Sequence, residues 1–212
     1  HFNNSTVRNG KMEKFDHNKK LKSFYNQSKK TISYIEIPSM QFLQIDGMGD
    51  PNSSKDFSLA VEALFKLSYT LKFDVKKSDL KIDYKVMPLE GLWWSDNMND
   101  FITENKQNWN WTLMIMQPEF ITTELFDAAM TKVKEKKNSI ALEKIGLAKF
   151  EEGASMQIMH MGPFSEEGPT IQKLHEHIIN NQYIRIGKHH EIYLSDIRRA
   201  APEKWRTILR QP

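Results

Sequence analysis

Apolar and polar residues alternate in seven short runs of the chain, and this period of two predicts half-buried β-strands. The runs occupy residues 32–37, 39–47, 81–89, 109–117, 155–162, 188–197 and 205–211. Pro38, Pro118 and Gly162 stand where three of these runs end, as expected of residues that interrupt strands. Residues 90–94, Glu-Gly-Leu-Trp-Trp, lie between two runs and are predicted to form a turn with two exposed tryptophans.

A period near 3.6 predicts three helices between these strands. Ser53 and Asp56 have the spacing of a capping box at the start of the first helix. Its apolar face is formed by Phe57, Val61, Leu64, Ser68 and Leu71. Thr122 and Thr123 are the expected caps of the second helix, whose stripe is Phe126, Ala129, Met130 and Val133. The third helix follows a polar loop at 165–169 and turns Ile171, Leu174 and Ile178 inward.

The order strand, helix, strand, strand occurs twice, and short sequence matches mark the two copies. Residues 39–43 match 155–159, and residues 111–118 match 205–212, each of the latter opening with Trp and closing with Gln-Pro. A duplicated helix-on-sheet unit is expected to pair its halves about a pseudo-two-fold axis, with a ligand groove between them. Duplication that only builds a stable sandwich is an equally good interpretation.

These patterns predict an α+β fold with an N-terminal arm at residues 1–30 and a single domain at 31–212. The domain would consist of repeats at 31–118 and 150–212, joined by a helical connector at 119–149. Residues 1–11 are polar and aperiodic. We leave them out of the fold, with Met12 as the expected natural start.

Composition narrows the function classes. The 212 residues are 39% hydrophobic and carry a formal charge of only +3, which gives no support for direct nucleic-acid binding. The absence of cysteine excludes disulfides, thiolate nucleophiles and cysteine-ligated metals, and it fits a cytoplasmic protein. No apolar run approaches the length that spans a bilayer, so no membrane partner is expected.

The run at 188–197 carries the most suggestive chemistry. Glu191 and Tyr193 share one face of the predicted strand, whereas Ile192 and Leu194 share the other. A carboxylate beside a phenol suits a cationic or aromatic ligand and is able to perform acid–base chemistry, provided that this face lines a cavity. If the face meets water, the strand is an ordinary edge.

The two strand-helix-strand-strand units, the segment Pro88–Trp94 and the Glu-x-Tyr motif at Glu191 together resemble the GyrI-like small-molecule-binding superfamily. The resemblance extends from Met12 to Pro212 and is strongest to the stand-alone bacterial branch. It implies duplicated SHS2-type units with Glu191 in a central groove, and multidrug-type ligands that are planar, hydrophobic or cationic. Some stand-alone members are similar to hydrolases that open the cyclopropane ring of DNA-alkylating cyclopropanoids. No helix-turn-helix segment precedes Thr31, which argues against a transcription activator of the usual architecture.

We therefore expect a stand-alone, cofactor-free protein that binds planar xenobiotics and hydrolyses cyclopropanoid genotoxins, a detoxification role. A non-catalytic binding or sensing module and a gyrase-inhibitor-like interaction domain are the alternatives, because fold alone does not separate them. Glu191, Glu124 and Tyr193 are the candidate catalytic residues. Glu124 has a competing interpretation as first-turn helix stabilisation, and Tyr193 as a half-buried strand tyrosine.

Further residues are candidate walls of the groove: Trp93, Trp94, Trp111, Met116 and His160. Each also has a structural interpretation, since tryptophan and methionine usually fill cores and a strand histidine is usually satisfied locally. The pairs His175 with His177 and His189 with His190 have poor spacing for a shared metal ion, and no metal is predicted. The sequence leaves the physiological ligand and the oligomeric state open.

Overall fold

A computed structural model describes residues 12–15, 21–96 and 105–212. Its centre is a closed barrel whose strands follow the order β2-β5-β4-β7-β8-β6, and each neighbouring pair is antiparallel. These strands are β2 (Ser33–Met48), β4 (Leu89–Trp94), β5 (Asn110–Gln117), β6 (Gly146–Met161), β7 (His189–Tyr193) and β8 (Arg206–Gln211). A small parallel sheet of β1 (Glu13–Phe15) and β3 (Ile82–Tyr84) lies beside the barrel.

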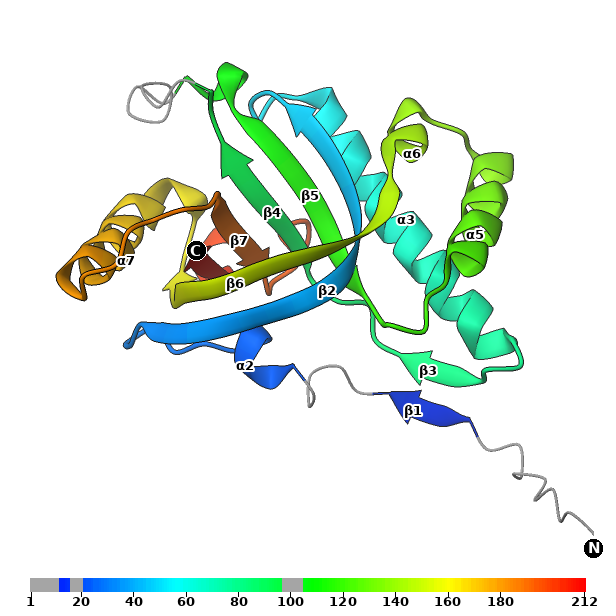
Figure 1. The fold of residues 1–212 in the computed structure, drawn as a ribbon. Helices are drawn as coiled ribbons and strands as arrows, with labels where there is room; N and C mark the ends of the chain where they lie inside the picture. The colour runs from blue at the N-terminus through cyan, green and yellow to red at the C-terminus, as the bar shows by residue number, and fades with distance from the viewer. Residues whose placement is uncertain (1–11, 16–20, 97–104) are drawn as a thin grey trace, which may run out of the picture.

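Helices cover the barrel on two sides (Figure 1). The long α3 (Lys55–Lys77) packs on β2 and β5, and α5 (Thr123–Lys136) and α6 (Ile140–Lys144) pack on α3. On the other side α7 (Glu167–Asn180) packs on β6. The remaining short elements are α2 (Lys22–Tyr25) and three 3₁₀ turns at Lys106–Asn108, Phe164–Glu166 and Pro202–Lys204.

The apolar stripes that predict the helices are the faces that the fold buries. All five predicted positions of α3, from Phe57 to Leu71, are buried against the barrel, so this stripe is confirmed. Removing a side chain such as Leu64 from water stabilises the fold by about 1.5–3 kcal/mol. A second, smaller core lies under α7, where Leu174 and Ile178 meet Ile158 and Leu209.

The helix caps follow the expected chemistry with one shift. Thr122 accepts a hydrogen bond from the backbone N–H of Leu125, as predicted for α5. The cap of α3 is Ser54, not Ser53: its hydroxyl accepts from the N–H of Phe57. Ser53 and Ser54 have the same side chain, so the sequence alone does not distinguish them as caps. In the structure Ser54 directly precedes the helix.

Strands β2 and β6 are longer than the sequence indicates because Pro38 does not end a strand. The two strands pair from Ser33 with Gln157 to Gln44 with Gly146, and only the position of Pro38 leaves a gap in the ladder. Proline lacks the N–H for one ladder bond, but the pairing on both sides holds the strand together. Gly153, which pairs with Ile37 next to this gap, adopts a φ of +77°, so β6 bends there.

The predicted turn at 90–94 is wrong. These residues form β4, and Trp93 is buried. Gly91 serves close packing rather than a turn: a Cβ at this position would lie 2.7 Å from Trp93 Nε1 and 3.2 Å from the Tyr193 hydroxyl. The polar loop predicted at 165–169 is also wrong in part, because α7 already begins at Glu167 and tolerates Pro169 in its first turn.

Apart from the short β3, the order strand, helix, strand, strand occurs as β2-α3-β4-β5 and again as β6-α7-β7-β8. In the barrel β2 pairs with β6, and β4 pairs with β7. Duplication, a pseudo-two-fold axis and the domain limits 31–212 remain proposals. Within the described residues no helix is long and apolar enough to cross a membrane. The expectation about residues 1–11 lies outside the described residues.

Candidate functional site: a buried carboxylate cluster beside a groove

Strands β4 and β7 lie side by side, and their register decides which side chains meet. Gly91 pairs with Glu191, and Leu89 pairs with Tyr193. Because side chains alternate across a strand, Glu191 and Tyr193 share one face with Trp93, whereas Glu90 and His190 lie on the opposite face. The predicted common face of Glu191 and Tyr193 is therefore present, and it is buried rather than exposed to water.

Glu191 is the centre of a hydrogen-bonded cluster on this face. Its Oε2 lies 2.8 Å from Nε2 of His189, and its Oε1 accepts a hydrogen bond of 3.1 Å from the Tyr193 hydroxyl. The Tyr193 oxygen in turn accepts from the indole N–H of Trp93, also at 3.1 Å. The chain of contacts fixes the orientation of both the phenol and the carboxylate.

A second carboxyl group joins the cluster from the first turn of α7. Glu167 is 6% exposed and hydrogen-bonds to Glu191. Burial, and then the negative charge of Glu191, raise the pKa of Glu167 to about 11, so this group holds a proton at neutral pH. Its Oε1 has no hydrogen-bond partner among the described residues.

The pKa of Glu191 moves the other way. Burial alone would raise it, but the hydrogen bond and charge of His189 and the hydrogen bonds from Glu167 and Tyr193 outweigh burial, so the net pKa is lower than usual. One carboxyl is thus an acid and its neighbour a carboxylate. Pairs of this kind, whose surroundings separate their pKa values, are typical of acid–base sites.

The same cluster has the composition of a small metal site. One oxygen from each of Glu167 and Glu191 and a ring nitrogen of His189 lie within 4.8 Å of one another. Two carboxylates and an imidazole are ligands that a divalent cation accepts. In the structure the proton on Glu167 removes the repulsion that a cation would otherwise have to compensate.

A groove of about 610 Å³ opens next to the cluster. Its lining includes Leu89 of β4, Tyr193 of β7 and Phe65 of α3, together with Tyr25 from the N-terminal arm. Glu191 itself does not line it. Tyr193 therefore connects the two features: it borders the groove and hydrogen-bonds to Glu191. A ligand in the groove would meet the cluster through this phenol.

Aromatic rings surround Trp93 and Tyr193. Phe57 of α3 lies 5.8 Å from Trp93, and Phe164 lies 5.5 Å from Tyr193, both measured between ring centroids. The Phe164 ring also lies 4.6 Å from that of Trp205 in a tilted arrangement. These contacts surround the cluster with apolar rings and lower its dielectric, which strengthens its hydrogen bonds.

The structure separates the other candidate residues from this cluster. Trp111 is 1% exposed and meets Phe57 edge-on at 5.4 Å, so it belongs to the core under α3. Trp94 lies on the opposite face of β4 with the Lys188 ammonium 3.4 Å above its ring. Met116 pairs with Phe42 and is buried.

Two further candidates have local partners. The ring of His160 lies 2.9 Å from the Thr170 hydroxyl and 3.1 Å from the Pro163 carbonyl, the arrangement of a satisfied strand histidine. Glu124 is exposed in the first turn of α5, where an acid complements the helix dipole. Of the three candidate catalytic residues, the structure brings together Glu191 and Tyr193 and not Glu124.

Sequence reasoning missed Glu167 and His189 as members of the cluster. Glu167 falls in a segment that looks like a loop, and its signal is Pro169, which fits the first turn of a helix better than a loop. The sequence places His189 two positions before Glu191 on the same strand face, but it shows no third residue near them that could complete a metal site. Only the fold, which brings Glu167 at the start of α7 next to Glu191, supplies one.

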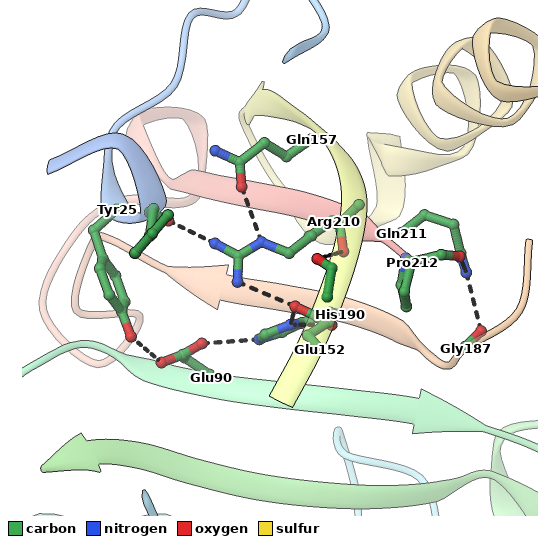
Figure 2. Close-up of polar contacts among 12 residues, drawn as sticks. Tyr25, Glu90, Glu152, Gln157, Gly187, His190, Arg210, Gln211 and Pro212 are labelled. Carbon is green, nitrogen blue, oxygen red and sulfur yellow. Dashed lines mark hydrogen bonds and ion pairs between the residues drawn. The ribbon is translucent and has the colours of Figure 1, made fainter. Parts of the chain in front are cut away.

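The opposite face of β4 and β7 carries a second polar network inside the barrel (Figure 2). His190 lies 2.9 Å from Glu90 and 2.8 Å from Glu152, and Arg210 contacts Glu152 at 3.2 Å. Tyr25 of the N-terminal arm donates to Glu90 at 2.7 Å. This hydrogen bond anchors the N-terminal arm to the polar network inside the barrel.

The bend at Gly153 makes this network feasible. Glu152 and Gln157 would face opposite sides of a regular strand, yet both contact Arg210, at 3.2 and 2.9 Å. Burial lowers the pKa of His190, but Glu152 and Glu90 raise it more, to a net value of about 9. Burial likewise raises the pKa of Glu152, and His190 and Arg210 bring it below its usual value.

Comparison with known proteins agrees with this fold. Residues 30–211 match the GyrI-like small molecule binding domain, and the chain belongs to this family. No curated protein matches the chain. Among solved structures, an uncharacterized conserved protein from Listeria innocua is 39% identical with a TM-score of 0.85, over 93% of this chain and 98% of its own.

Two further structures from Listeria innocua are described as hydrolases. One is 38% identical with a TM-score of 0.80, over 93% of this chain and 98% of the other. The second is 37% identical with a TM-score of 0.81, over 94% and 99%. The chain is thus a GyrI-like small-molecule-binding protein with near relatives that are called hydrolases.

Proposed function

We propose that this protein is a hydrolase that adds water across the cyclopropane ring of planar cyclopropanoid compounds, with the groove as its binding site. The observation that carries the proposal is the pairing of a carboxylate, Glu191, with a neutral phenol, Tyr193, where that phenol borders the groove. The similarity to two proteins described as hydrolases supports a hydrolytic reaction. Such a reaction would detoxify a DNA-alkylating ligand.

The proposed reaction balances without a cofactor. Glu191, which does not itself line the groove, accepts a proton from a water molecule that lies between it and the substrate, as the water oxygen bonds to a ring carbon of the cyclopropane. The electrons of the breaking C–C bond move to the conjugated carbonyl of the substrate, whose oxygen receives a proton from Tyr193. The proton on Glu191 then returns to Tyr193 across their 3.1 Å hydrogen bond, and the net change is the addition of one water.

Glu167 has a supporting role in this scheme. Its proton is shared with Glu191, and it leaves the two buried carboxyls with a single negative charge. Trp93 donates to the phenol oxygen and so holds the Tyr193 hydroxyl hydrogen toward Glu191. We infer that Glu191 and Tyr193 are the catalytic residues and that Glu167, His189 and Trp93 position them.

The test is incubation of the purified protein with a neutral cyclopropanoid, followed by mass spectrometry for the water adduct. The wild type is expected to form the adduct, and Glu191→Gln to slow its formation by about 10²–10⁴-fold, because the amide no longer accepts the proton. Glu151→Gln, an exposed glutamate on β6, is the matched control and is expected to keep full activity.

Two outcomes would contradict the proposal. If Glu191→Gln turns over at the wild-type rate while remaining folded, Glu191 is not the base. If the wild type forms no adduct but the cyclopropanoid raises its melting temperature, the protein is a binding or sensing module instead of an enzyme.

A further inference from the structure

The charged side chains that line the groove are mainly cationic, although the buried Glu191 next to it is a carboxylate. We propose that the groove selects ligands with a flat apolar body and an acidic group, such as a carboxylate, sulfonate or phosphate. This inference rests on the proposed function, for which it names the ligand class.

The groove lining has an excess of positive charge. Among the described residues its cationic side chains are Lys22, Lys85, Arg198 and Arg206, and its one carboxylate is Asp196. Asp196 is already bound, because Arg198 contacts it at 3.1 and 3.2 Å and Arg199 reaches it at 3.7 Å. This carboxylate therefore does little to neutralise the remaining cations.

Three of the cations lack a carboxylate partner. Among residues 12–15, 21–96 and 105–212, no Asp or Glu side chain forms an ion pair with Lys22, Lys85 or Arg206. They come from α2, from the segment before β4 and from β8, so separate parts of the chain bring positive charge to one groove. An ordinary solvent-exposed helix face would instead have its lysines on one helix, so these three cations are not explained in that way.

The groove also has the surface that a flat ring needs. Val61, Leu89 and Tyr193 are buried residues at its wall, and the Arg198 guanidinium lies 4.5 Å from the centroid of Phe65. An aromatic ligand can extend this cation–π stack. The volume of about 610 Å³ lies within the range of roughly 300–1,000 Å³ that is usual for drug-sized ligands.

These two properties determine how a ligand would lie. The apolar body would stack on the Arg198 guanidinium that covers Phe65, with one end at Tyr193. The acidic group would face Lys85 and Arg206 at the rim. A positive rim above walls of low dielectric attracts anions and disfavours cations. A permanently cationic ligand would leave these rim charges unpaired and add repulsion.

The test compares three flat probes by fluorescence titration of the full-length protein. The probes are 8-anilino-1-naphthalenesulfonate, its neutral parent N-phenyl-1-naphthylamine and the cation acridine orange. The anionic probe is expected to bind about fivefold or more tightly than the neutral one, and the cation weakest. Raising the ionic strength should weaken only the anionic probe, since salt screens exposed charges.

Substitutions test whether the groove cations are the groups that bind the anionic probe. Lys85→Gln/Arg206→Gln is expected to weaken the anionic probe about fivefold, because each exposed ion pair contributes roughly 1.4- to 5-fold, and to leave the neutral probe unchanged. Lys173→Gln, an exposed lysine of α7 outside the groove, is the matched control and should change neither.

Equal or tighter binding of the neutral or cationic probe by the wild type would overturn the proposal, and so would the lack of saturable binding of all three. Unchanged affinity of the anionic probe for the folded double variant would overturn it as well. None of these results affects water addition to a neutral cyclopropanoid, so failure of the ligand class and failure of the proposed reaction are distinguishable.

Discussion

Tyr193 donates its hydroxyl hydrogen to Glu191 over 3.1 Å and at the same time borders the groove. The phenol is therefore the one member of the described cluster that both reaches the carboxylate and lines the groove. Burial, followed by the charges of Glu191 and Glu167, raises the pKa of Tyr193 well above its usual value, so it stays a neutral donor. A neutral donor next to a carboxylate is what proton delivery to a carbonyl oxygen requires.

Tyr193→Phe tests this role. We expect kcat for water addition to fall by about 10²–10³-fold with little change in KM, since the lost hydrogen bond acts on the charge that develops during reaction. Stability should drop by only about 1 kcal/mol, because Trp93 and Glu191 each lose one partner. Steady-state kinetics with Tyr183→Phe, an exposed tyrosine, as control would measure the difference. A kcat equal to that of the wild type would exclude Tyr193 as the donor.

Two buried groups with raised pKa values, Glu167 and His190, predict how stability depends on pH near neutrality. Glu167 has a folded-state pKa of about 11 against an ordinary 4.5, and His190 about 9 against 6.5. Because both values are raised, each group contributes stability that is fully present below its ordinary pKa and is lost as pH rises through the folded value. Between pH 7.5 and 8.5 the folded state therefore holds about two more protons than the unfolded state.

The free energy of unfolding should then decrease by about 2.7 kcal/mol per pH unit in that window, or about 1.4 kcal/mol per proton. Glu167→Gln, which mimics the protonated carboxyl, should remove roughly half of this slope and stabilise the protein at pH 8. His190→Gln should remove the other half but destabilise the fold, because Glu152 and Glu90 lose their shared partner. Urea titrations at several pH values measure these slopes; a flat profile for the wild type would refute both assignments.

Local patterns in the sequence predicted the secondary structure around the site better than its tertiary pairing. The alternation at 188–197 and the stripe from Phe57 to Leu71 each depend on neighbours in the sequence. The stripe is buried as predicted, and the alternating run contains β7, although this strand covers only His189–Tyr193. The buried Trp93 could not be inferred in this way. Gly91 looks like a turn residue in the sequence, whereas its real constraint is the close approach of the Trp93 indole and of the Tyr193 hydroxyl, the latter from a distant strand.

The same distinction between local pattern and tertiary packing applies to the residues of the candidate site. Glu191 and Tyr193 were found because they share a strand face, but Glu167 and the interior network of Glu90, His190 and Arg210 depend on packing between distant elements. Isolated charges within apolar strands, such as Glu90 beside Leu89, are the signal that could have indicated a buried network.

Chelation tests whether the cluster of Glu167, His189 and Glu191 works with a proton or with a metal ion. The proton on Glu167 already balances the two carboxyls, so we expect prolonged dialysis against EDTA to leave kcat and the melting temperature unchanged. Added zinc should not raise activity, and at high concentration it should inhibit by competing for the carboxylate that activates water. Loss of activity on chelation that zinc or manganese restores would show that the metal-free mechanism is wrong.

Gly91→Ala tests whether the geometry of the cluster, rather than its composition, sets the activity. The new methyl carbon would lie 2.7 Å from Trp93 Nε1 and 3.2 Å from the Tyr193 oxygen, so at least one ring has to move away. Such displacement should lengthen the hydrogen bonds that join Trp93, Tyr193 and Glu191 and slow turnover by about tenfold or more. The overpacking should cost about 1–3 kcal/mol of stability. Gly146→Ala in β6, where a Cβ meets no atom within 4 Å, is the matched control and should keep activity. Because Gly91→Ala removes no polar group, normal turnover in a folded variant would mean that this hydrogen-bonded chain does not govern the reaction.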